Sequence, residues 1–484
     1  MIHNSTSESI TQQKELNKKI AISNQNRDKS IARSEKSNAC DYSLSTEHEI
    51  RCFFNEVSIN SPIGALLITM LLTGRSVDTL LNNTDAFKVA SSESKYQGFL
   101  FFEVNREYPC SHLNLNKREA NKNGLVSIPR ELTVFLSKIL CVESLSDDYI
   151  DKLKEKMRQI LSNINKKHNT RLTLSKICRP FNAYCTHRGI SEIFAGIIAG
   201  KGLSEHSGNY YTGYINGQVL EILQQFAKYL ESLAEKSLFT FPTVSSYLSC
   251  GSSRVPEKNL VTEYFYSLEK LSKDAKNSGE LIVLHNIFTA YTVGILQIAT
   301  CHRPENHAFG TLSNFDLISG DVFISDKETG DNHKRIISVV ETALIQVRNY
   351  LNHLEKLRDI STYLYPAVSC GVSDILNSKE NLFCYIKKDS FQFEKPLDYP
   401  EEMADIDLPG VSNYYRHLLR THFEQQKLPT DLIDCFMGHE NKRDHSKGRF
   451  SSLENKHFEL ITDSIDKLFA ELRITPFISP IEEW

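Results

Sequence analysis

The sequence predicts an α+β protein, mostly α, built from two tandem units that are each helical with a small antiparallel sheet. Three observations predict this class. Apolar residues recur at helical spacing along most of the chain, whereas strand-like runs are few. Two short strand-like runs stand in each half of the chain. The order of elements after residue 281 repeats the order after residue 46, which is typical of one architecture used twice.

Hydrophobic spacing places the elements of the first half. The second of its predicted helices is apolar on every side, so we expect it to be buried. Pro129 ends a strand-like run and is well suited to the start of the next helix. The predicted helices cover residues 47–57, 62–74, 130–140, 192–200 and 217–236, and the predicted strands cover residues 98–108 and 124–129.

The second half repeats this order. It opens with a long apolar helix, followed by a polar turn, two strand-like runs and an amphipathic helix. Two further helices come near the end. The predicted helices cover residues 281–300, 341–358, 414–426 and 431–438, and the predicted strands cover residues 320–326 and 335–340.

Composition divides the chain into four segments. Residues 1–45 are polar and have too few large apolar side chains to order themselves, so we expect a disordered tail. A Ser-rich stretch with two Pro and a Gly marks a boundary at 237–256. We therefore expect one folded unit at 46–236, a linker and helical segment at 237–280, and a second folded unit at 281–484.

Overall composition excludes several classes of protein. The chain has 484 residues, of which 40% are hydrophobic and 24% charged, which excludes a fibrous or wholly disordered protein. Its 56 Lys and Arg against 60 Asp and Glu make a purely electrostatic nucleic-acid binder a poor fit. A neutral protein with local basic patches is still allowed.

The cysteines and the apolar runs indicate in which cellular compartment the protein is expected. The eleven Cys are scattered singly without a CxxC pair, so we expect reduced thiols and no zinc site. The N-terminus lacks the apolar region of a signal peptide. The apolar run at 63–72 is too short to cross a bilayer. We therefore expect a cytoplasmic protein with no membrane partner.

Basic side chains in the second half stand in an order suited to phosphodiester chemistry. Arg303 follows the long apolar helix, and Lys327 lies in the turn between the two strands. His417 and Arg420 share one helix face, and His439 follows a glycine after the next helix. Guanidinium groups bind phosphate oxygens in pairs, and a Lys or His can protonate the leaving oxygen, so this scheme needs no metal or cofactor. Taken singly, each residue also fits a structural role such as a helix cap.

This order resembles the catalytic domain of the tyrosine recombinase/phage integrase superfamily over residues 281–470. The pattern of that family is an Arg after a turn, a Lys in a β-hairpin, His-x-x-Arg, Gly-His and then a Tyr nucleophile. The resemblance implies that the two arginines clamp the scissile phosphate, that Lys327 is the general acid and that the two histidines assist proton transfer.

The second half departs from that pattern at the nucleophile. No Tyr follows Tyr415, and Phe450 stands near the expected position. A phenyl ring has no oxygen and cannot form a phosphotyrosyl bond. The second half is therefore either inactive in cleavage or uses a nucleophile from elsewhere.

The first half resembles a degenerate copy of the same domain over residues 48–215, and it carries a tyrosine. By resemblance, Arg75 and Arg179 are the two arginines, whereas Lys176 replaces a family histidine. Tyr211 falls where the family has its nucleophile, although an aromatic ring there also fits a packing role. Tyr211 would act within its own half or join the second-half cluster of a neighbouring subunit.

A basic stretch in the first half is a candidate DNA contact. Residues 151–180 hold six Lys and three Arg against one Asp and one Glu. Lys166, Lys167 and Lys176 are the residues that we expect to meet DNA. A solvated face is the alternative for such a charge run.

The resemblance implies site-specific DNA recombination or integration, with strand breakage and rejoining through a phosphotyrosyl intermediate. The partner is double-stranded DNA, together with a second recombinase or further copies of this chain, and the setting is a mobile element. The alternative is a non-catalytic integrase-derived protein that binds DNA beside another recombinase. Phe450 favours this alternative, and so does the lack of an evident N-terminal DNA-clamping domain.

Overall fold

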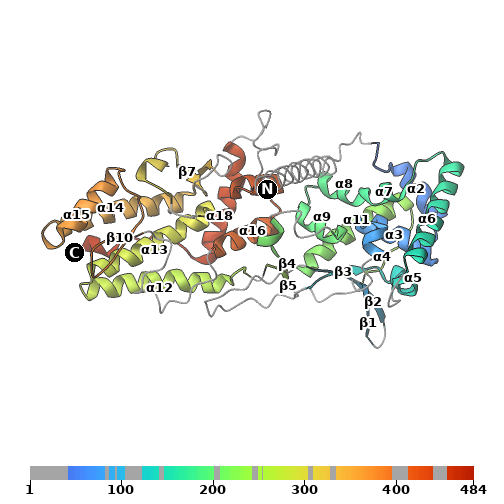
Figure 1. The fold of residues 1–484 in the computed structure, drawn as a ribbon, viewed down its shortest axis with the longest axis horizontal. Coiled ribbons are helices and arrows are strands. Elements are labelled where there is room, and N and C mark those ends of the chain that lie inside the picture. The colour runs from blue at the N-terminus through green and yellow to red at the C-terminus, as the bar shows by residue number, and fades with distance from the viewer. Residues whose placement is uncertain are drawn as a thin grey trace, which may run out of the picture.

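The structure is a computed structural model of the 484-residue chain. It describes residues 42–81, 87–92, 95–103, 123–140, 146–200, 208–241, 249–252, 254–303, 309–326, 334–394, 413–439 and 455–483. The molecule is elongated, with the first half of the chain at one end and the second half at the other (Figure 1). The tail predicted at 1–45 lies outside the described residues up to residue 41.

The described part of the first half is a helical body with one three-stranded sheet. Its helices are α2 (Glu47–Glu56), α3 (Pro62–Thr73), α4 (Val77–Leu81), α5 (Arg130–Leu140), α6 (Asp147–His168), α7 (Leu174–Ile177), α8 (Arg179–His187), α9 (Glu192–Ala199), α10 (Gly208–Tyr211) and α11 (Asn216–Ala234). Its strands are β1 (Phe87–Ser92), β2 (Lys95–Glu103), β3 (Asn123–Ile128) and β4 (Gly213–Ile215). The first three form an antiparallel sheet in the order β1-β2-β3.

The described part of the second half is also helical, with small antiparallel sheets. Its α-helices are α12 (Lys258–Asn277), α13 (Leu281–Thr300), α14 (Glu341–Leu364), α15 (Pro366–Leu376), α16 (Tyr414–Gln425), α17 (Thr430–Met437) and α18 (Glu459–Leu472). Its 3-10 helices are η2 (Leu312–Asn314), η6 (Asn455–Phe458) and η7 (Pro480–Glu483). Its strands are β6 (Phe315–Asp316), β7 (Asp321–Ser325), β8 (Lys334–Ser338), β9 (Tyr385–Ile386) and β10 (Phe393–Glu394). An antiparallel sheet has the order β6-β7-β8, and Phe323 pairs with Ile336 in it.

The prediction of a mostly helical α+β protein with small antiparallel sheets is confirmed. The predicted strand and helix at 124–140 are β3 and α5, and those at 335–358 are β8 and the first part of α14. The 237–280 segment holds the expected helix, α12, but it also supplies the strand β5 (Ser249–Gly251). This strand pairs with β4, so residues 249–251 of the expected linker belong to the folded structure.

Local signals explain the two buried helices that centre the halves. In α3, the Ser61 hydroxyl accepts a hydrogen bond from the backbone N–H of Gly64 at 3.0 Å, and Pro62 fits the first turn. Gly74 ends the helix in the left-handed conformation. By length and composition, α13 could cross a membrane, but in the structure nearly all of its residues are buried in protein.

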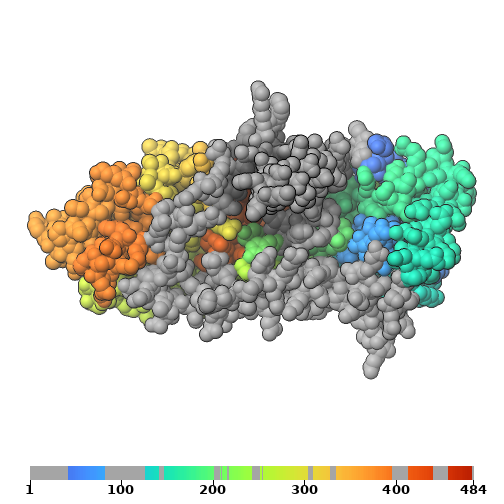
Figure 2. All heavy atoms as spheres, in the orientation of Figure 1, coloured from blue at the N-terminus to red at the C-terminus, as the bar shows by residue number. Residues whose placement is uncertain are grey.

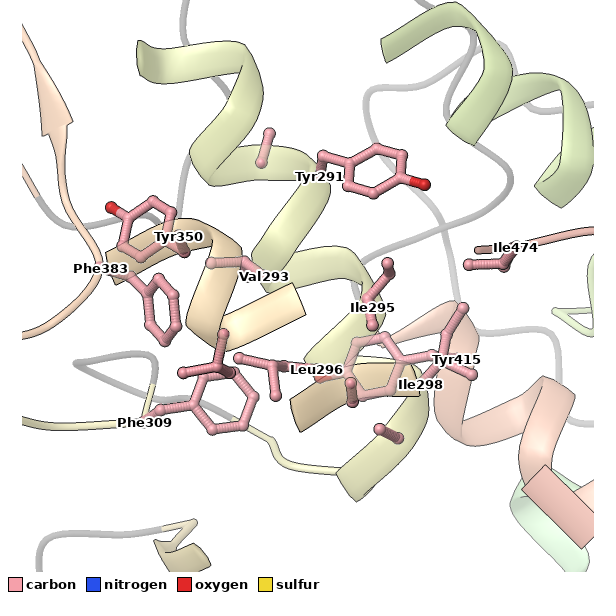
Figure 3. Packing of buried hydrophobic residues seen from close by; sticks show 14 of the residues in the cluster. Tyr291, Val293, Ile295, Leu296, Ile298, Phe309, Tyr350, Phe383, Tyr415 and Ile474 are labelled. Carbon is pink, nitrogen blue, oxygen red and sulfur yellow. The ribbon is translucent and has the colours of Figure 1, made fainter. Parts of the chain in front are cut away.

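The buried hydrophobic side chains form two clusters, one in each half. In the second cluster, Tyr350 and Phe383 lie beside Val293 of α13, whereas Tyr415 lies beside Ile298 (Figure 3). Tyr415 thereby fixes α16 against the end of α13. Its hydroxyl also donates a hydrogen bond to the carbonyl oxygen of His302 at 2.5 Å. This packing holds the basic face of α16 at a defined place.

Candidate active site

A segment of the first half crosses to α16 in the middle of the molecule, where green atoms meet orange-red ones in Figure 2. The backbone N–H of Gly213 donates to the Thr421 hydroxyl at 2.9 Å. A Cβ atom on Gly208 would lie 2.6 Å from Nη2 of Arg420, so only glycine permits this close approach. The helix α10 is thereby held against the second half.

Tyr211, at the end of α10, lies on three basic side chains of the second half. Its ring stacks on His439 with centroids 4.9 Å apart and meets His417 at 4.8 Å. The guanidinium of Arg416 stands over the same ring, 5.2 Å from its centroid. Tyr211 also packs against the hydrophobic cluster of the second half, not that of its own half.

Arg416 is buried and binds the carboxyl ends of two helices. Its Nη1 donates to the carbonyl oxygen of Cys301 at 2.6 Å, and its Nη2 donates to that of Met437 at 2.9 Å. These carbonyls end α13 and α17, where the helix dipole is negative and favours a cation. Nη2 also donates to Nε2 of His439 at 2.6 Å, so the proton of that ring belongs on Nδ1.

Both histidines against Tyr211 are held neutral. Burial, reinforced by Arg254 and Arg416, lowers the pKa of His417 to about 3. Burial and the nearby arginines lower the pKa of His439 to about 4, although Asp434 opposes them. Nδ1 of His417 lies 2.7 Å from the Ser252 hydroxyl. Near neutral pH both rings are therefore neutral, and the lone pair on Nε2 of His439 is already taken by the hydrogen bond from Arg416.

Arg420 is fully buried one helical turn beyond Arg416 and is neutralised there. Its Nη1 donates to the Asp434 carboxylate, and its Nε lies 3.0 Å from Glu424. Burial would raise the pKa of Asp434, but Arg420 and His439 outweigh it and lower that pKa to about 2. Burial raises the pKa of Glu424. Arg420 thus faces carboxylates and the backbone of Gly208.

Asp326 ties the end of β7 to the segment after α13. It accepts hydrogen bonds from Nδ1 of His302 at 2.8 Å, from the backbone N–H of Arg303 at 2.8 Å and from Nη1 of Arg335 at 2.7 Å. Burial opposes ionisation of this carboxyl, but His302, Arg335 and Arg416 hold its pKa well below its usual range. Asp326 is therefore ionised and joins three elements beside Arg416.

No family model, curated protein or solved structure matches this chain. The site must therefore be interpreted from its own geometry. Within the described ranges, no group of three or more His, Cys, Asp or Glu side chains is arranged to hold a metal ion.

Of the residues predicted from the sequence of the second half, the structure brings His417 and His439 together against Tyr211. Arg303 has an exposed position, and its described contact is the backbone hydrogen bond to Asp326. Lys327 and Phe450 lie outside the described residues. Arg420 adjoins the cluster but is engaged by its own carboxylates.

The first-half residues are not gathered in the same way. Arg75 is buried and donates to the carbonyl oxygens of Ile198 at 2.8 Å and Ile197 at 3.3 Å. Arg179 is exposed on α8 and bonds to the Ser43 hydroxyl. Neither arginine lies against Tyr211, because α10 carries that ring to the other half.

The lysines predicted to contact DNA divide into two kinds. Lys166 and Lys167 are exposed on α6, and Nζ of Lys167 pairs with Glu56 at 2.8 Å. Lys176 is buried and pairs with Glu49 at 3.2 Å. The prediction that Lys176 contacts DNA, or replaces a catalytic histidine, does not fit this position, because its ammonium group is used inside the first half.

Sequence reasoning missed four residues of this site: Ser252, Arg254, Arg335 and Arg416. Arg254 donates to the Tyr210 hydroxyl at 2.6 Å and stands over its ring. No motif marks Ser252 and Arg254, because they lie in the stretch taken as a linker. A signal for Arg416 did exist, since it precedes Arg420 by four residues and therefore shares its helix face.

Proposed function

We propose that this chain is an integrase-like DNA strand transferase, with two tandem catalytic-domain-like units, in which Tyr211 attacks a DNA phosphodiester. The observation that carries the proposal is the contact of the Tyr211 ring with Arg416, His417 and His439. A hydroxyl nucleophile, a guanidinium and neutral imidazoles are the groups that such a transfer uses. The reaction would serve integration or excision of a mobile element.

The groups can be assigned roles in one transesterification. The Tyr211 hydroxyl oxygen forms a bond to phosphorus as one phosphorus–oxygen bond of the DNA backbone breaks. The phenolic proton passes to the neutral imidazole of His417, since the lone pair of His439 is taken by Arg416, and the leaving DNA oxygen takes up a proton, for which Lys327 is the candidate donor. Arg416 stabilises the negative charge of the pentacoordinate state. Reversal of these steps rejoins the strand.

The proposal assigns the nucleophile and the basic cluster to different halves of one chain. This division fits the sequence, because the second half has Phe450 near the usual nucleophile position. It also fits the fold, because β4 pairs with β5 and the N–H of Gly213 bonds to Thr421. Tyr211 is thus held at the second-half cluster by backbone contacts. Delivery from a neighbouring subunit is not required.

Covalent trapping tests the proposal. A pool of nicked double-stranded DNA of random sequence should yield a DNA adduct that resists detergent, with the DNA on Tyr211 in the isolated peptide. Tyr211→Phe should abolish the adduct and leave DNA binding nearly unchanged, because the ring and its stacking remain. Tyr210→Phe is the matched control and should retain the adduct. An adduct that survives in Tyr211→Phe would refute the assignment.

A non-catalytic DNA-binding partner of another recombinase is the second candidate. The observation that favours it is the burial of Arg420 against Asp434 and Glu424, together with the exposed position of Arg303. Only Arg416 of these three arginines then stands at the Tyr211 ring. DNA binding without any adduct in the trapping experiment would support this candidate over the first.

A further inference from the structure

Two guanidinium groups from different elements flank the turn that follows α17. Arg416 donates to the carbonyl oxygen of Met437 and to His439. Arg335, on β8, approaches Gly438 from another side, since a Cβ atom on Gly438 would lie 2.7 Å from its Nη1. Gly438 also has a φ of +69°, so glycine is required here twice over. The glycine at position 438 therefore leaves the space that the guanidinium group of Arg335 occupies.

Several N–H groups of these two side chains have no acceptor. Nε and Nη2 of Arg335 and Nε of Arg416 are buried and without a hydrogen-bond partner in the part of the chain that the structure describes. The side chains are only 7% and 3% exposed. Unsatisfied buried donors are costly and rare, so their concentration at one turn points to a ligand that accepts hydrogen bonds.

The charge balance at this turn indicates that the ligand is an anion. Asp326 is the carboxylate that faces both guanidinium groups, at 2.7 Å from Nη1 of Arg335 and 3.9 Å from Nη1 of Arg416. One negative charge therefore stands against two positive ones among the described residues. Arg420 also has two buried N–H groups without a hydrogen bond among the described residues, Nε and Nη2, but its charge is balanced because Asp434 and Glu424 pair with it. The excess positive charge is thus at Arg335 and Arg416.

We propose that Arg335 and Arg416 together form a binding site for a phosphate oxyanion beside the turn Met437–His439, and that Asp326 orients both guanidinium groups. The free Nε and Nη2 of Arg335 can bind two oxygens of a tetrahedral phosphate, and the free Nε of Arg416 can donate to a third. The stacking of Tyr211 on His439 brings its ring next to the same turn. The inference rests on the proposed function only in naming DNA as the source of the phosphate, and it adds Arg335 to the site.

Thermal unfolding with inorganic phosphate tests the site. Phosphate should stabilise the full chain in a saturable way and beyond sodium chloride of equal ionic strength. Arg335→Gln should weaken the apparent affinity at least tenfold, and Arg335→Lys should weaken it less because the charge remains. Arg358→Gln is the matched control, since Arg358 is half-exposed and pairs only with the adjacent Asp359 among the described residues. It should match the unaltered chain.

Two results would overturn the site. One is a phosphate effect no larger than that of chloride, and the other is an equal phosphate effect in Arg335→Gln. If Arg335→Gln does not fold, Arg335→Lys and ³¹P line broadening of bound phosphate give the same comparison. An unchanged affinity in Arg335→Lys would also count against the site, and so would the absence of ³¹P line broadening in the unaltered chain.

Competition distinguishes the two sources of phosphate. A short DNA duplex should displace inorganic phosphate if the site takes a DNA phosphodiester. Phosphate binding that depends on Arg335 but persists under saturating duplex assigns the site to free phosphate or a small phosphorylated ligand. Neither readout uses strand cleavage, so failure of the covalent trapping experiment leaves this test independent.

Discussion

The two halves of the molecule share several local features and differ in how these features are used. In each, a buried apolar helix ends in the left-handed conformation, at Gly74 after α3 and at Cys301 after α13. In each, an eight-residue helix ends at a left-handed glycine, Gly200 after α9 and Gly438 after α17, both with φ of 69° and ψ of 27°. In each, an antiparallel three-stranded sheet follows the apolar helix.

The difference concerns the guanidinium group that packs on the glycine. In the first half this group is Arg75, whose Cζ would lie 3.2 Å from a Cβ atom on Gly200. In the second half it is Arg335, which comes from the sheet, whereas Arg303 has an exposed position. The equivalent place is therefore filled from a different element.

The arginine at the first-half glycine is therefore structural, whereas the one at the second-half glycine belongs to a cluster suited to ligand binding. Arg75 donates to two carbonyl oxygens at the end of α9, and burial lowers its pKa to about 10. The second half gathers Arg335, Arg416 and two neutral histidines at the matching turn, and the first half supplies the aromatic ring. The first half thus contributes structure and Tyr211, while the second contributes the basic cluster.

The largest difference between the two halves is expected in their stability toward acid, which should be lower in the second half. In the second core, His353 lies 3.1 Å from His285, which lies 3.1 Å from the carbonyl oxygen of Cys384. Ser479 lies 2.7 Å from the other nitrogen of His353. All of these contacts are satisfied with both rings neutral if each histidine carries its proton on Nε2 and the Ser479 hydroxyl donates to Nδ1 of His353. Burial lowers the pKa of His285 to about 4 and that of His353 well below its usual range.

Protonation of these two histidines favours the unfolded chain. Below the unfolded pKa of about 6.5, the unfolded chain binds a proton that the folded core refuses, so stability is lost as pH falls from 6.5 toward 4. His285 alone would cost about 3 kcal/mol at pH 4. In the first half, burial opposes ionisation of Glu49, but hydrogen bonds from the backbone N–H groups of Thr46 and Arg171 and from Lys176 lower its pKa. The stability that Glu49 contributes is therefore lost only as pH falls below about 4.5.

Hydrogen exchange measured between pH 7.5 and 5, and corrected for intrinsic rates, checks this order. Amides of α13 and α14 should lose protection before those of α3 and α5. The double variant His285→Gln, His353→Gln should weaken the dependence on pH. A parallel loss of protection in both halves of the unaltered chain would contradict the prediction.

The arginines that follow the two apolar helices should differ in their effect on stability. Arg75→Met leaves the carbonyl oxygens of Ile197 and Ile198 without their donor inside the protein, which should cost about 2 kcal/mol. Arg303→Met should leave the melting temperature nearly unchanged, because the position is exposed. Thermal and urea unfolding measure both. Equal destabilisation by the two substitutions would show that Arg303 is held by more than its backbone.

Much of the fold could be predicted from the sequence because it depends on local rules. Ser61, Pro62 and Gly74 mark the ends of α3, and a long apolar run marks α13. The short strands β4 and β5 were missed, because three residues carry too little periodicity to be recognised. Their pairing depends on a contact between residues far apart in the chain.

The candidate site could be predicted only in part, for the same reason. His417 and His439 belong to a local motif, so the sequence pointed to them. Arg335 and Ser252 reach the site through strand pairing and the crossing of α10, which no spacing reveals. Burial of Lys176 against Glu49 was equally hidden, because Glu49 is 127 residues away.

Substitution of the two left-handed glycines should affect stability in both cases but phosphate binding in only one. Gly200→Ala and Gly438→Ala each force a Cβ atom into a φ of 69°, which should cost about 1 kcal/mol of stability. Only Gly438→Ala should also weaken phosphate binding, because its Cβ atom would displace Arg335. Thermal unfolding with and without phosphate measures both effects. Equal loss of phosphate affinity in Gly200→Ala would show that the effect is not local.

The smallest effect on stability is expected at the exposed lysines of α6, where the prediction concerns DNA. Lys166→Glu with Lys167→Glu should lower the melting temperature only slightly, since both side chains are exposed and the pair of Lys167 with Glu56 lies at the surface. DNA affinity should fall. The magnitude of the slope of log affinity against log salt should decrease by about one to two, because fewer counterions are released on binding when phosphate contacts are lost. The matched control is Lys379→Glu with Lys388→Glu, two exposed lysines of the second half that each pair with one carboxylate. The control should keep both the affinity and the slope. If the α6 pair behaves like the control, that helix face is only solvated, and DNA contacts must come from elsewhere in the chain.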